Sequence, residues 1–410
     1  MILEFILAIL VGVLIGTLTG ITPGIHINLV AVILLSFSAY LLSFSIITPI
    51  ILVIFIVSMA ITHTFVDFIP SIFLGAPDED TILSILPGHK FLLKGLGYEA
   101  IVYTLYGGLM SLIIILIFVP IFIFILPLLY PFIQKIMWII LILVSFFLIK
   151  SEPKKKFFAL IIFLLAGFLG IASLNLNVKE PLLPLLTGLF GASNLLISIR
   201  QNTKIPSQKI SLLKNIKISK NSITRGSLAS IISAPFTAFL PGLGASEAAI
   251  IGQQFLKIED NKEFLFLLGA ISTIVMGLSF VAFYSIQKTR TGAAVAVSKL
   301  LPEPTLNNLF LIILTIIISG LFAFQLSLHI SKFASKNIHK IKYSKLSIII
   351  LIVLLAIVFI FSDFTFRGKM LSLLIFIAST SLGIFTILSG VRRMHLMGCL
   401  LVPTILFYLI

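Results

Sequence analysis

The sequence predicts an all-α polytopic membrane protein with about ten full spans. Of its 410 residues, 59% are hydrophobic and only 10% are charged, whereas soluble domains have roughly 45–50% apolar and about 25% charged residues. A water-soluble fold of this size has no room to bury so much apolar surface. The apolar runs are continuous rather than alternating, which excludes a membrane β-barrel.

Apolar runs of membrane length fall into two sets. The first set lies at about 46–66, 100–126, 136–149, 157–174 and 182–199. The second set lies at about 264–284, 304–325, 346–361, 369–390 and 395–410. Two further stretches, 5–45 and 226–257, are interrupted by Pro23-Gly24 and Pro241-Gly242, where a helix is expected to break. Each of these two stretches is predicted to be a re-entrant hairpin.

Basic residues gather in four stretches between the apolar runs, at 150–156, 200–225, 332–345 and 392–393. Cytoplasmic loops carry the excess of Lys and Arg, so these stretches are predicted to face the cytoplasm and both termini to lie outside a cell membrane. The same orientation places Lys90, Lys94, Lys257 and Lys262 inside. Of the 29 Lys and Arg residues, this assignment leaves outside only Lys135, Lys179, Lys288, Arg290, Lys299, Arg367 and Lys369. The net charge of +15 is therefore explained by orientation in the bilayer, and no nucleic-acid partner is expected.

The two halves of the chain resemble each other. Residues 19–25 match 237–243 at an offset of 218, and later Gly-Ala and Leu-Pro pairs match at offsets of 217 and 215. Five crossings in each half invert the second copy relative to the first. We predict a first inverted repeat at 1–200, a basic cytoplasmic linker at 201–225 and a second inverted repeat at 226–410. Inverted repeats with broken segments in matching positions are typical of secondary transporters that bind substrate near the membrane midplane.

The residues around the two Pro-Gly breaks are candidates for substrate binding. Irregular backbone at membrane depth occurs only where protein or a water-filled cavity satisfies it, and half-helix ends offer free N–H groups to an anion. Glycine lets the backbone approach a ligand closely, although close helix packing is an alternative role. The candidates are Gly24, His26, Asn28, Gly242, Gly244 and Ser246.

Charged residues supply further candidates. Lys288 and Arg290 are predicted to contact an anion, because Arg presents a bidentate fork to a carboxylate; lipid head groups are the alternative partner. His63 and Asp67 lie four residues apart and share a helix face. This pair and Glu247 are candidates for binding the coupling ion or proton, with a position at the membrane interface as the alternative for the pair.

Catalysis has less support in the sequence. Ser246 in Gly-Leu-Gly-Ala-Ser superficially resembles a nucleophile on a Gly-rich turn, but no His occurs between residues 222 and 328. The chain has neither a metal-ligand spacing of Cys and His nor a phosphate-binding Gly-x-x-x-x-Gly-Lys loop. We therefore predict no enzyme activity, no metal site and no cofactor; Na⁺ or H⁺ is expected as the coupling ion.

Several motifs together resemble those of the TctA family, the large membrane subunit of tripartite tricarboxylate transporters, and its archaeal-type members in particular. The motifs are Gly12–Gly16, Gly20–Gly24, Gly75–Pro77, Leu86–His89, Lys94–Ala100, Gly188–Ala192, Pro241–Ala245 and Met397–Pro403. The resemblance implies gradient-driven uptake of carboxylates such as citrate. It also implies a small membrane subunit and an extracytoplasmic binding protein as partners. The alternative is that a chain of this archaeal-type composition acts alone.

Together, these observations predict a secondary active transporter of a small organic anion, a carboxylate, that is coupled to Na⁺ or H⁺. Access would alternate around a midplane site between the two hairpins. A flippase for an anionic lipid carrier such as a polyprenyl phosphate is the alternative hypothesis, and a membrane-embedded enzyme with Ser246 as nucleophile is a third.

Overall fold

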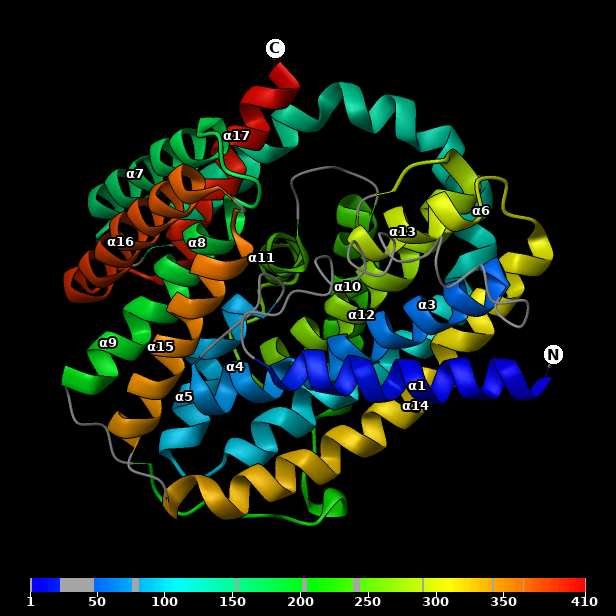
Figure 1. Cartoon of the computed structure of the whole chain (residues 1–410), viewed down its shortest axis with the longest axis horizontal. Helices are drawn as coiled ribbons and strands as arrows, with labels where there is room; N and C mark the ends of the chain where they lie inside the picture. Colours follow the sequence, from blue (N-terminus) through cyan, green and yellow to red (C-terminus); the bar gives the residue numbers. More distant parts are fainter. Residues whose placement is uncertain are drawn as a thin grey trace.

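The computed structural model describes residues 2–22, 48–75, 81–150, 152, 155–200, 205–238, 244–289, 291–340, 343–363 and 365–409. This part of the chain is helical and contains no strand (Figure 1). The first half holds α1 (Ile2–Ile21), α3 (Pro49–Val66), α4 (Phe68–Leu74), η1 (Ile82–Ser84), α5 (Ile85–Leu93), α6 (Gly97–Lys150), α7 (Lys156–Asn175), α8 (Leu182–Leu186), the π-helical η2 (Thr187–Ala192) and α9 (Ser193–Arg200).

The second half contains a similar series of helices. They are η3 (Leu213–Asn215), α10 (Lys220–Ala238), α11 (Ala245–Leu256), α12 (Asn261–Ile286), α13 (Gly292–Leu300), α14 (Leu306–Asn337), η4 (Ile338–Lys340), α15 (Tyr343–Phe361), α16 (Phe366–Ser389), η5 (Arg393–Met397) and α17 (Gly398–Leu409). Side chains cap four of these helices: Asp260, Thr291, Thr305 and Thr365 each accept a hydrogen bond from a first-turn N–H, which fixes where α12, α13, α14 and α16 begin.

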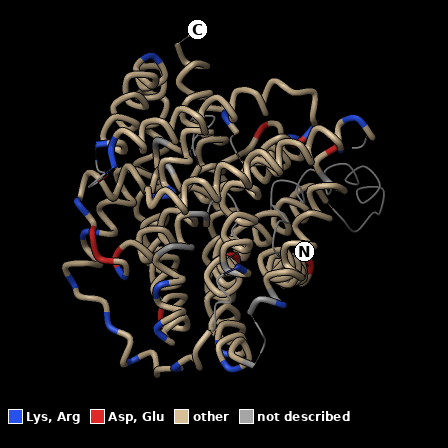
Figure 2. The backbone as a smooth tube through the Cα atoms, turned by 90° about the vertical axis from the view of Figure 1, so that its left-hand side faces the viewer, with Lys and Arg blue, Asp and Glu red and all other residues tan. Residues whose placement is uncertain are grey.

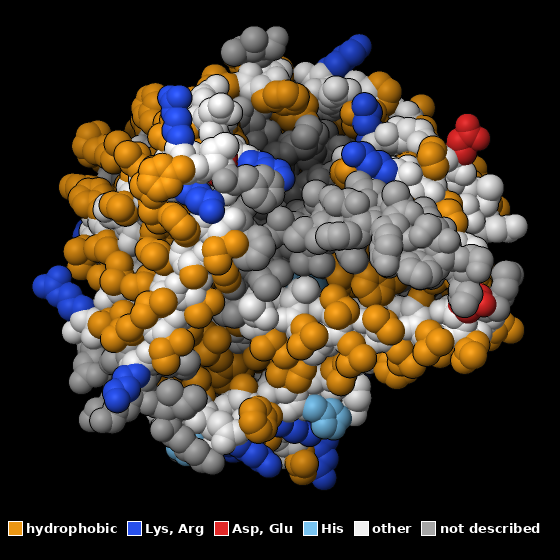
Figure 3. Space-filling model, viewed as in Figure 1, with side chains coloured by type: hydrophobic (Ala, Val, Ile, Leu, Met, Phe, Trp, Pro, Cys, Tyr) orange, Lys and Arg blue, Asp and Glu red, His pale blue; other side chains and the backbone are white. Residues whose placement is uncertain are grey.

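Seven helices of the described chain are long and apolar enough to cross a membrane: α1, the α3–α4 unit, α6, α7, α12, α14 and α16. Three shorter apolar helices cover 182–197, 347–360 and 393–409. Exposed hydrophobic side chains cover much of one face of the molecule, along α1 and α14 and over α7, α15 and α16 (Figure 3). A surface of this kind is soluble in lipid rather than water, so the prediction of an all-α polytopic membrane protein is confirmed.

The innermost helix is α12. In its most apolar stretch 94% of the residues are buried, against 72% for the α3–α4 unit and 28% for α6. It packs mainly on α6 and α10, while α3 packs mainly on α1 and α14 (Figure 1). Where α12 crosses α6, a Cβ atom at Gly269 would collide with the Thr104 carbonyl oxygen. The absence of side chains there lets the two backbones touch.

The first half differs from the prediction at one boundary. Two separate helices were expected at 100–126 and 136–149, but α6 runs without interruption from Gly97 to Lys150 and arches over the top of the view in Figure 1. Pro120, Pro127 and Pro131 lie inside it. Each proline removes one backbone hydrogen bond and favours bending of the helix. The sequence around them contains no polar loop at which the helix would end. A straight helix of 54 residues would be about 80 Å long, well beyond the ~30 Å bilayer core.

The contact between α7 and α17 depends on glycine. A Cβ atom at Gly170 would collide with the Cys399 carbonyl oxygen, and a Cβ atom at Gly398 would collide with the Phe163 carbonyl oxygen. The two backbones therefore touch directly, as small residues allow in membrane proteins.

A second contact, between α16 and η2, is built in the same way. A Cβ atom at Gly383 would collide with the Leu189 carbonyl oxygen, and one at Gly188 would lie 2.7 Å from the Phe376 carbonyl oxygen. In both helix pairs, each helix contributes one glycine, and that glycine lies against a backbone carbonyl of the other helix.

Basic loops lie against one another at one end of the molecule. The buried Glu152 carboxylate contacts His395 Nε2 at 3.0 Å and accepts a hydrogen bond from the Arg392 N–H at 3.2 Å. The Gln208 side chain, on the segment before α10, bonds both the Leu92 carbonyl and the Gly97 N–H. Most Lys and Arg residues follow the left-hand and lower edges of the tube in Figure 2.

A separate loop pair connects the two halves elsewhere. The Lys179 N–H donates to the Asp363 carboxylate at 2.9 Å, and the Glu180 N–H donates to the Ser362 carbonyl at 2.9 Å. The α7–α8 loop and the α15–α16 loop are therefore neighbours. Both were predicted to lie on the side opposite the four basic stretches.

Candidate functional site

The polar residues His63 and Asp67 lie at the bend between α3 and α4. Both side chains are buried, with 3% and 4% of their surface exposed. The His63 Nδ1 lies 3.1 Å from the Thr19 hydroxyl of α1, and the Asp67 N–H donates to the His63 carbonyl. Two ionisable groups are thus buried where α1 meets the α3–α4 unit, an environment typical of ion or proton sites in membrane proteins.

The second predicted break lies between α10 and α11. Gly244 and Ser246 are buried at the start of α11, which begins at Ala245. At the far ends of the pair, Arg225 Nη2 donates to the Leu256 and Lys257 carbonyls at 2.6 and 2.9 Å. The beginning of α10 and the end of α11 therefore lie together, so the two helices are antiparallel.

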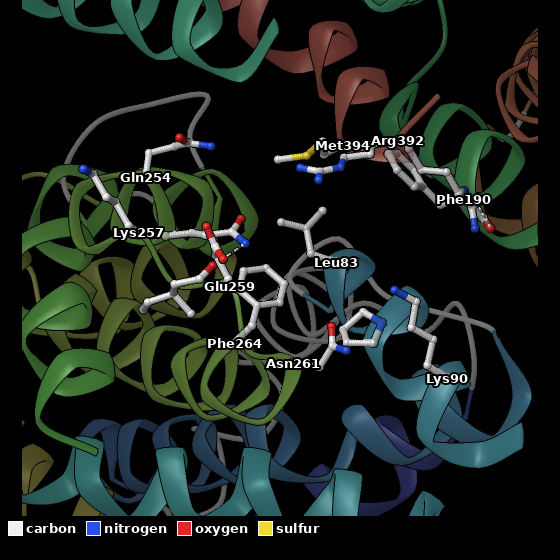
Figure 4. A pocket seen from close by; sticks show the side chains of 14 residues that line it. Leu83, Lys90, Phe190, Gln254, Lys257, Glu259, Asn261, Phe264, Arg392 and Met394 are labelled. Atoms are coloured by element: carbon white, nitrogen blue, oxygen red, sulfur yellow. Dashed lines mark hydrogen bonds between the residues drawn. The ribbon is translucent and has the colours of Figure 1, made fainter. Parts of the chain in front are cut away.

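A cavity of about 630 Å³ lies among helix ends from both halves (Figure 4). Its walls come from η1, α5 and η2 of the first half, and from η5 and the end of α11 with the start of α12 in the second half. Among the described residues, one carboxylate, Glu259, and four cationic side chains line it: Lys90, Lys257, Arg392 and Arg393. The described lining therefore carries an excess of three positive charges. A volume of this size suits a small organic ligand.

Arg393 is the buried member of this group, with 7% of its surface exposed. Its Nη2 donates to the Leu189 and Phe190 carbonyls and to the Ser193 hydroxyl. The guanidinium also lies over the Phe190 ring, 5.4 Å from the centroid. These contacts join η5 to η2, and they hold the guanidinium in one orientation at the cavity wall.

His89 of α5 lies near Arg393, in a helix outside the candidate spans. Burial and the positive charge of Arg393 together lower the pKa of the imidazole to about 4, although a hydrogen bond to the Ile72 backbone acts to raise it. At neutral pH this histidine is therefore uncharged and adds nothing to the positive charge of the cavity.

A family model described as Tripartite tricarboxylate transporter TctA family matches residues 6–398. The chain belongs to the TctA family. It is also 31% identical over 362 residues to Uncharacterized protein MJ1079 of Methanocaldococcus jannaschii, covering 87% of this chain and 88% of that protein. No solved structure matches the chain. The resemblance predicted from the Gly- and Pro-rich motifs is thus confirmed, and the chain is a multi-pass membrane protein of a transporter family rather than of an enzyme family.

In this TctA-family chain, several predicted site residues lie outside the described part. These are Gly24, His26, Asn28, Gly242 and Arg290, together with the side chain of Glu247. Their predicted roles stay predictions. Among the others, Lys288 is exposed after α12 and does not line the cavity, whereas Gly244, Ser246, His63 and Asp67 are buried.

The cationic group of the TctA-family cavity was not predicted as a site. Lys90, Lys257, Arg392 and Arg393 were interpreted only as markers of the cytoplasmic side. The available signal was the Arg-Arg pair directly before the last apolar run. That pair does not reveal that the second guanidinium is buried, because its partners lie about two hundred positions earlier in the chain.

Proposed function

We propose that this chain is a secondary active transporter of a small organic anion, a carboxylate, driven by a gradient of Na⁺ or H⁺. The observation that carries the proposal is the match to a tricarboxylate transporter family over residues 6–398, in a chain with seven helices that can cross a membrane among its described residues. Because the family is named tripartite, a small membrane subunit and an extracytoplasmic binding protein are proposed partners.

Matched glycine contacts support two inverted repeats at 1–200 and 226–410, joined by the linker at 201–225. Gly170 and Phe163 correspond to Gly383 and Phe376 at an offset of 213, and Gly188 and Leu189 correspond to Gly398 and Cys399 at an offset of 210. By these offsets α7 corresponds to α16 and η2 corresponds to α17, so the α7–α17 contact and the α16–η2 contact are equivalent in the two repeats. The packing of α12 on α6 corresponds in the same way to that of α3 on α14.

The loop contacts support the proposed orientation. Loops assigned to the cytoplasm bond one another, as Glu152 does with His395 and Gln208 with Leu92. Loops assigned to the outside also pair, through Lys179 and Asp363. Contacts of this kind are expected if each set shares one side of the membrane.

The proposed substrate site lies near the membrane midplane, between the two broken segments. Backbone N–H groups at the breaks would bind a carboxylate, and Lys288 with Arg290 would attract it from outside. The burial of Asp67 and His63 supports a coupling role for them, shared with Glu247. The residues proposed to bind substrate are Gly24, His26, Asn28, Gly242, Gly244, Ser246, Lys288 and Arg290.

Uptake by proteoliposomes tests this function. The purified chain is reconstituted, and labelled citrate, succinate and acetate are supplied under an imposed Na⁺ or pH gradient. We expect one of the two gradients to drive uptake of a di- or tricarboxylate, and an ionophore that collapses this gradient to abolish it. Flat uptake for every acid would contradict the proposal, and co-purified polyprenyl phosphate in native mass spectra would favour a lipid flippase instead.

A matched pair of variants assigns the coupling step. Asp67→Asn removes a buried carboxylate, whereas Glu303→Gln removes an exposed one after α13. We expect gradient-driven uptake to fall at least tenfold in the first variant and to change less than twofold in the second. Equal losses in both variants would argue against a coupling role for Asp67.

A further inference from the structure

The cavity between the helix ends has charged groups on facing walls. Lys90 extends from α5, and Arg392 extends from the segment before η5 on the other side, with both charged ends directed into the space (Figure 4). Lys257 and Glu259 come from the loop between α11 and α12. An anion inside the cavity would therefore meet positive charge from both halves of the chain.

The Arg393 side chain is fixed before any ligand arrives. All of its hydrogen bonds to described residues use Nη2, and its buried Nε has no hydrogen-bond partner among them. No described carboxylate forms a salt bridge with this guanidinium. A buried cation without an anionic partner is costly, and a bound oxyanion at the cavity wall would offset that cost.

Neutral donors and apolar surfaces complete the walls. The amide side chains of Gln254 and Asn261 line the cavity, as do Leu83, Phe190 and Phe264. Small-molecule sites commonly combine apolar walls with a few placed polar groups in this way. The mixture suits a ligand that has both charged ends and a short carbon skeleton.

We propose that this cavity is a binding site for a small polycarboxylate, with Lys90 and Arg392 contacting separate carboxylates and Arg393 holding one of them from the wall. Charges on facing walls match two separated carboxylates better than the single compact charge of a phosphate. The described residues proposed for the midplane site, Gly244, Ser246 and Lys288, do not line this cavity, and on the orientation proposed above the cavity faces the cytoplasm. The cytoplasmic position and the role as a second site for the transported anion rest on the proposed function; binding itself does not.

Equilibrium binding to the purified full chain tests the site without any gradient. Citrate, inorganic phosphate and acetate are titrated by isothermal calorimetry at constant low ionic strength. We expect citrate to bind at least tenfold more tightly than phosphate or acetate. Phosphate binding as tight as citrate binding would overturn the assignment to a polycarboxylate, and so would an absence of citrate binding.

Variants locate the bound citrate. The double variant Lys90→Gln, Arg392→Gln changes two exposed side chains and leaves the buried contacts of η5 in place. We expect it to raise the Kd for citrate at least tenfold. The control Lys217→Gln neutralises an exposed charge on the linker outside the cavity and is expected to shift the Kd less than twofold.

A third variant, Arg393→Lys, keeps the charge but loses the planar fork, and is expected to weaken citrate binding about tenfold. An unchanged Kd in the double variant, or an equal rise in the linker control, would overturn the proposal. If the cavity variants weaken citrate binding but the chain transports nothing, the binding site is supported and the proposed transport function is refuted. If the chain transports citrate but the Kd for citrate does not change in the Lys90 and Arg392 variants, the transport function is supported and the binding site is refuted.

Discussion

At the scale of single residues, Arg393 connects the two halves of the molecule. Its Nη2 donates to two carbonyls and one hydroxyl of 189–193, and hydrogen bonds from a charged donor contribute about 1.5–3 kcal/mol each. We predict that Arg393→Gln lowers the free energy of unfolding by about 3 kcal/mol. The neighbouring exposed Arg392→Gln should change it by about 0.5 kcal/mol or less. Thermal unfolding in detergent measures both, and equal shifts would contradict a structural role for Arg393.

His89 predicts a pH dependence of stability. Its pKa is about 4 in the fold, because of burial and the nearby Arg393 charge, against 6.5 for an unperturbed histidine. Between these two values the unfolded chain binds a proton that the folded chain does not bind. Stability should therefore be fully present above pH 6.5 and fall as pH drops towards 4, by at most roughly 1.4 kcal/mol per pH unit. In His89→Gln the free energy of unfolding should fall less steeply with decreasing pH, by the contribution of up to one bound proton. Parallel stability profiles for the variant and the unmodified chain would refute this.

Sequence reasoning at this scale identified residue types but not their surroundings. The i to i+4 spacing put His63 and Asp67 at the end of one span; in the structure His63 lies in the last turn of α3, Asp67 follows it directly, and both are buried. The cationic cavity was missed because its described walls come from four separate stretches of the chain. Local spacing carries no information about which helix ends meet in the folded chain.

At the scale of elements, the α7–α17 and α16–η2 contacts provide a matched test. Gly170→Ala and Gly383→Ala each place a Cβ atom against a partner backbone carbonyl, and overpacking of this kind costs about 1–3 kcal/mol. We predict a similar loss of stability for both variants, measured as the temperature at which the monodisperse peak disappears in size-exclusion chromatography. Phe168→Leu, on the exposed face of α7, is the control. A loss at only one glycine would count against the repeat.

Continuous apolar runs were sufficient to predict most helices. The expected spans at 46–66, 157–174 and 264–284 correspond to α3, α7 and α12 within a few residues. The boundary between 126 and 136 was wrong, because proline is tolerated in an apolar helix more readily than a sequence pattern suggests. α14 is longer than expected, since its last turns continue through Lys332 and Lys336.

At the scale of the whole molecule, orientation is the first quantity to test. In a Cys399→Ala background, Lys214→Cys places one thiol on the basic linker, and Glu303→Cys places one after α13; both positions are exposed. We predict that a membrane-impermeant maleimide added to intact cells labels the second variant only, and labels both after permeabilisation. Labelling of both in intact cells, or of Lys214→Cys alone, would contradict the proposed orientation.

The central claim is that carboxylate movement is thermodynamically coupled to an ion gradient. The most direct measurement is the zero-flux point in proteoliposomes, at which a fixed gradient of labelled citrate is balanced by an opposing gradient of Na⁺ or H⁺. The account predicts that net citrate flux reverses at a defined ion gradient, and that this point shifts in proportion to the imposed citrate ratio. A zero-flux point that stays at equal citrate concentrations under every ion gradient would contradict it.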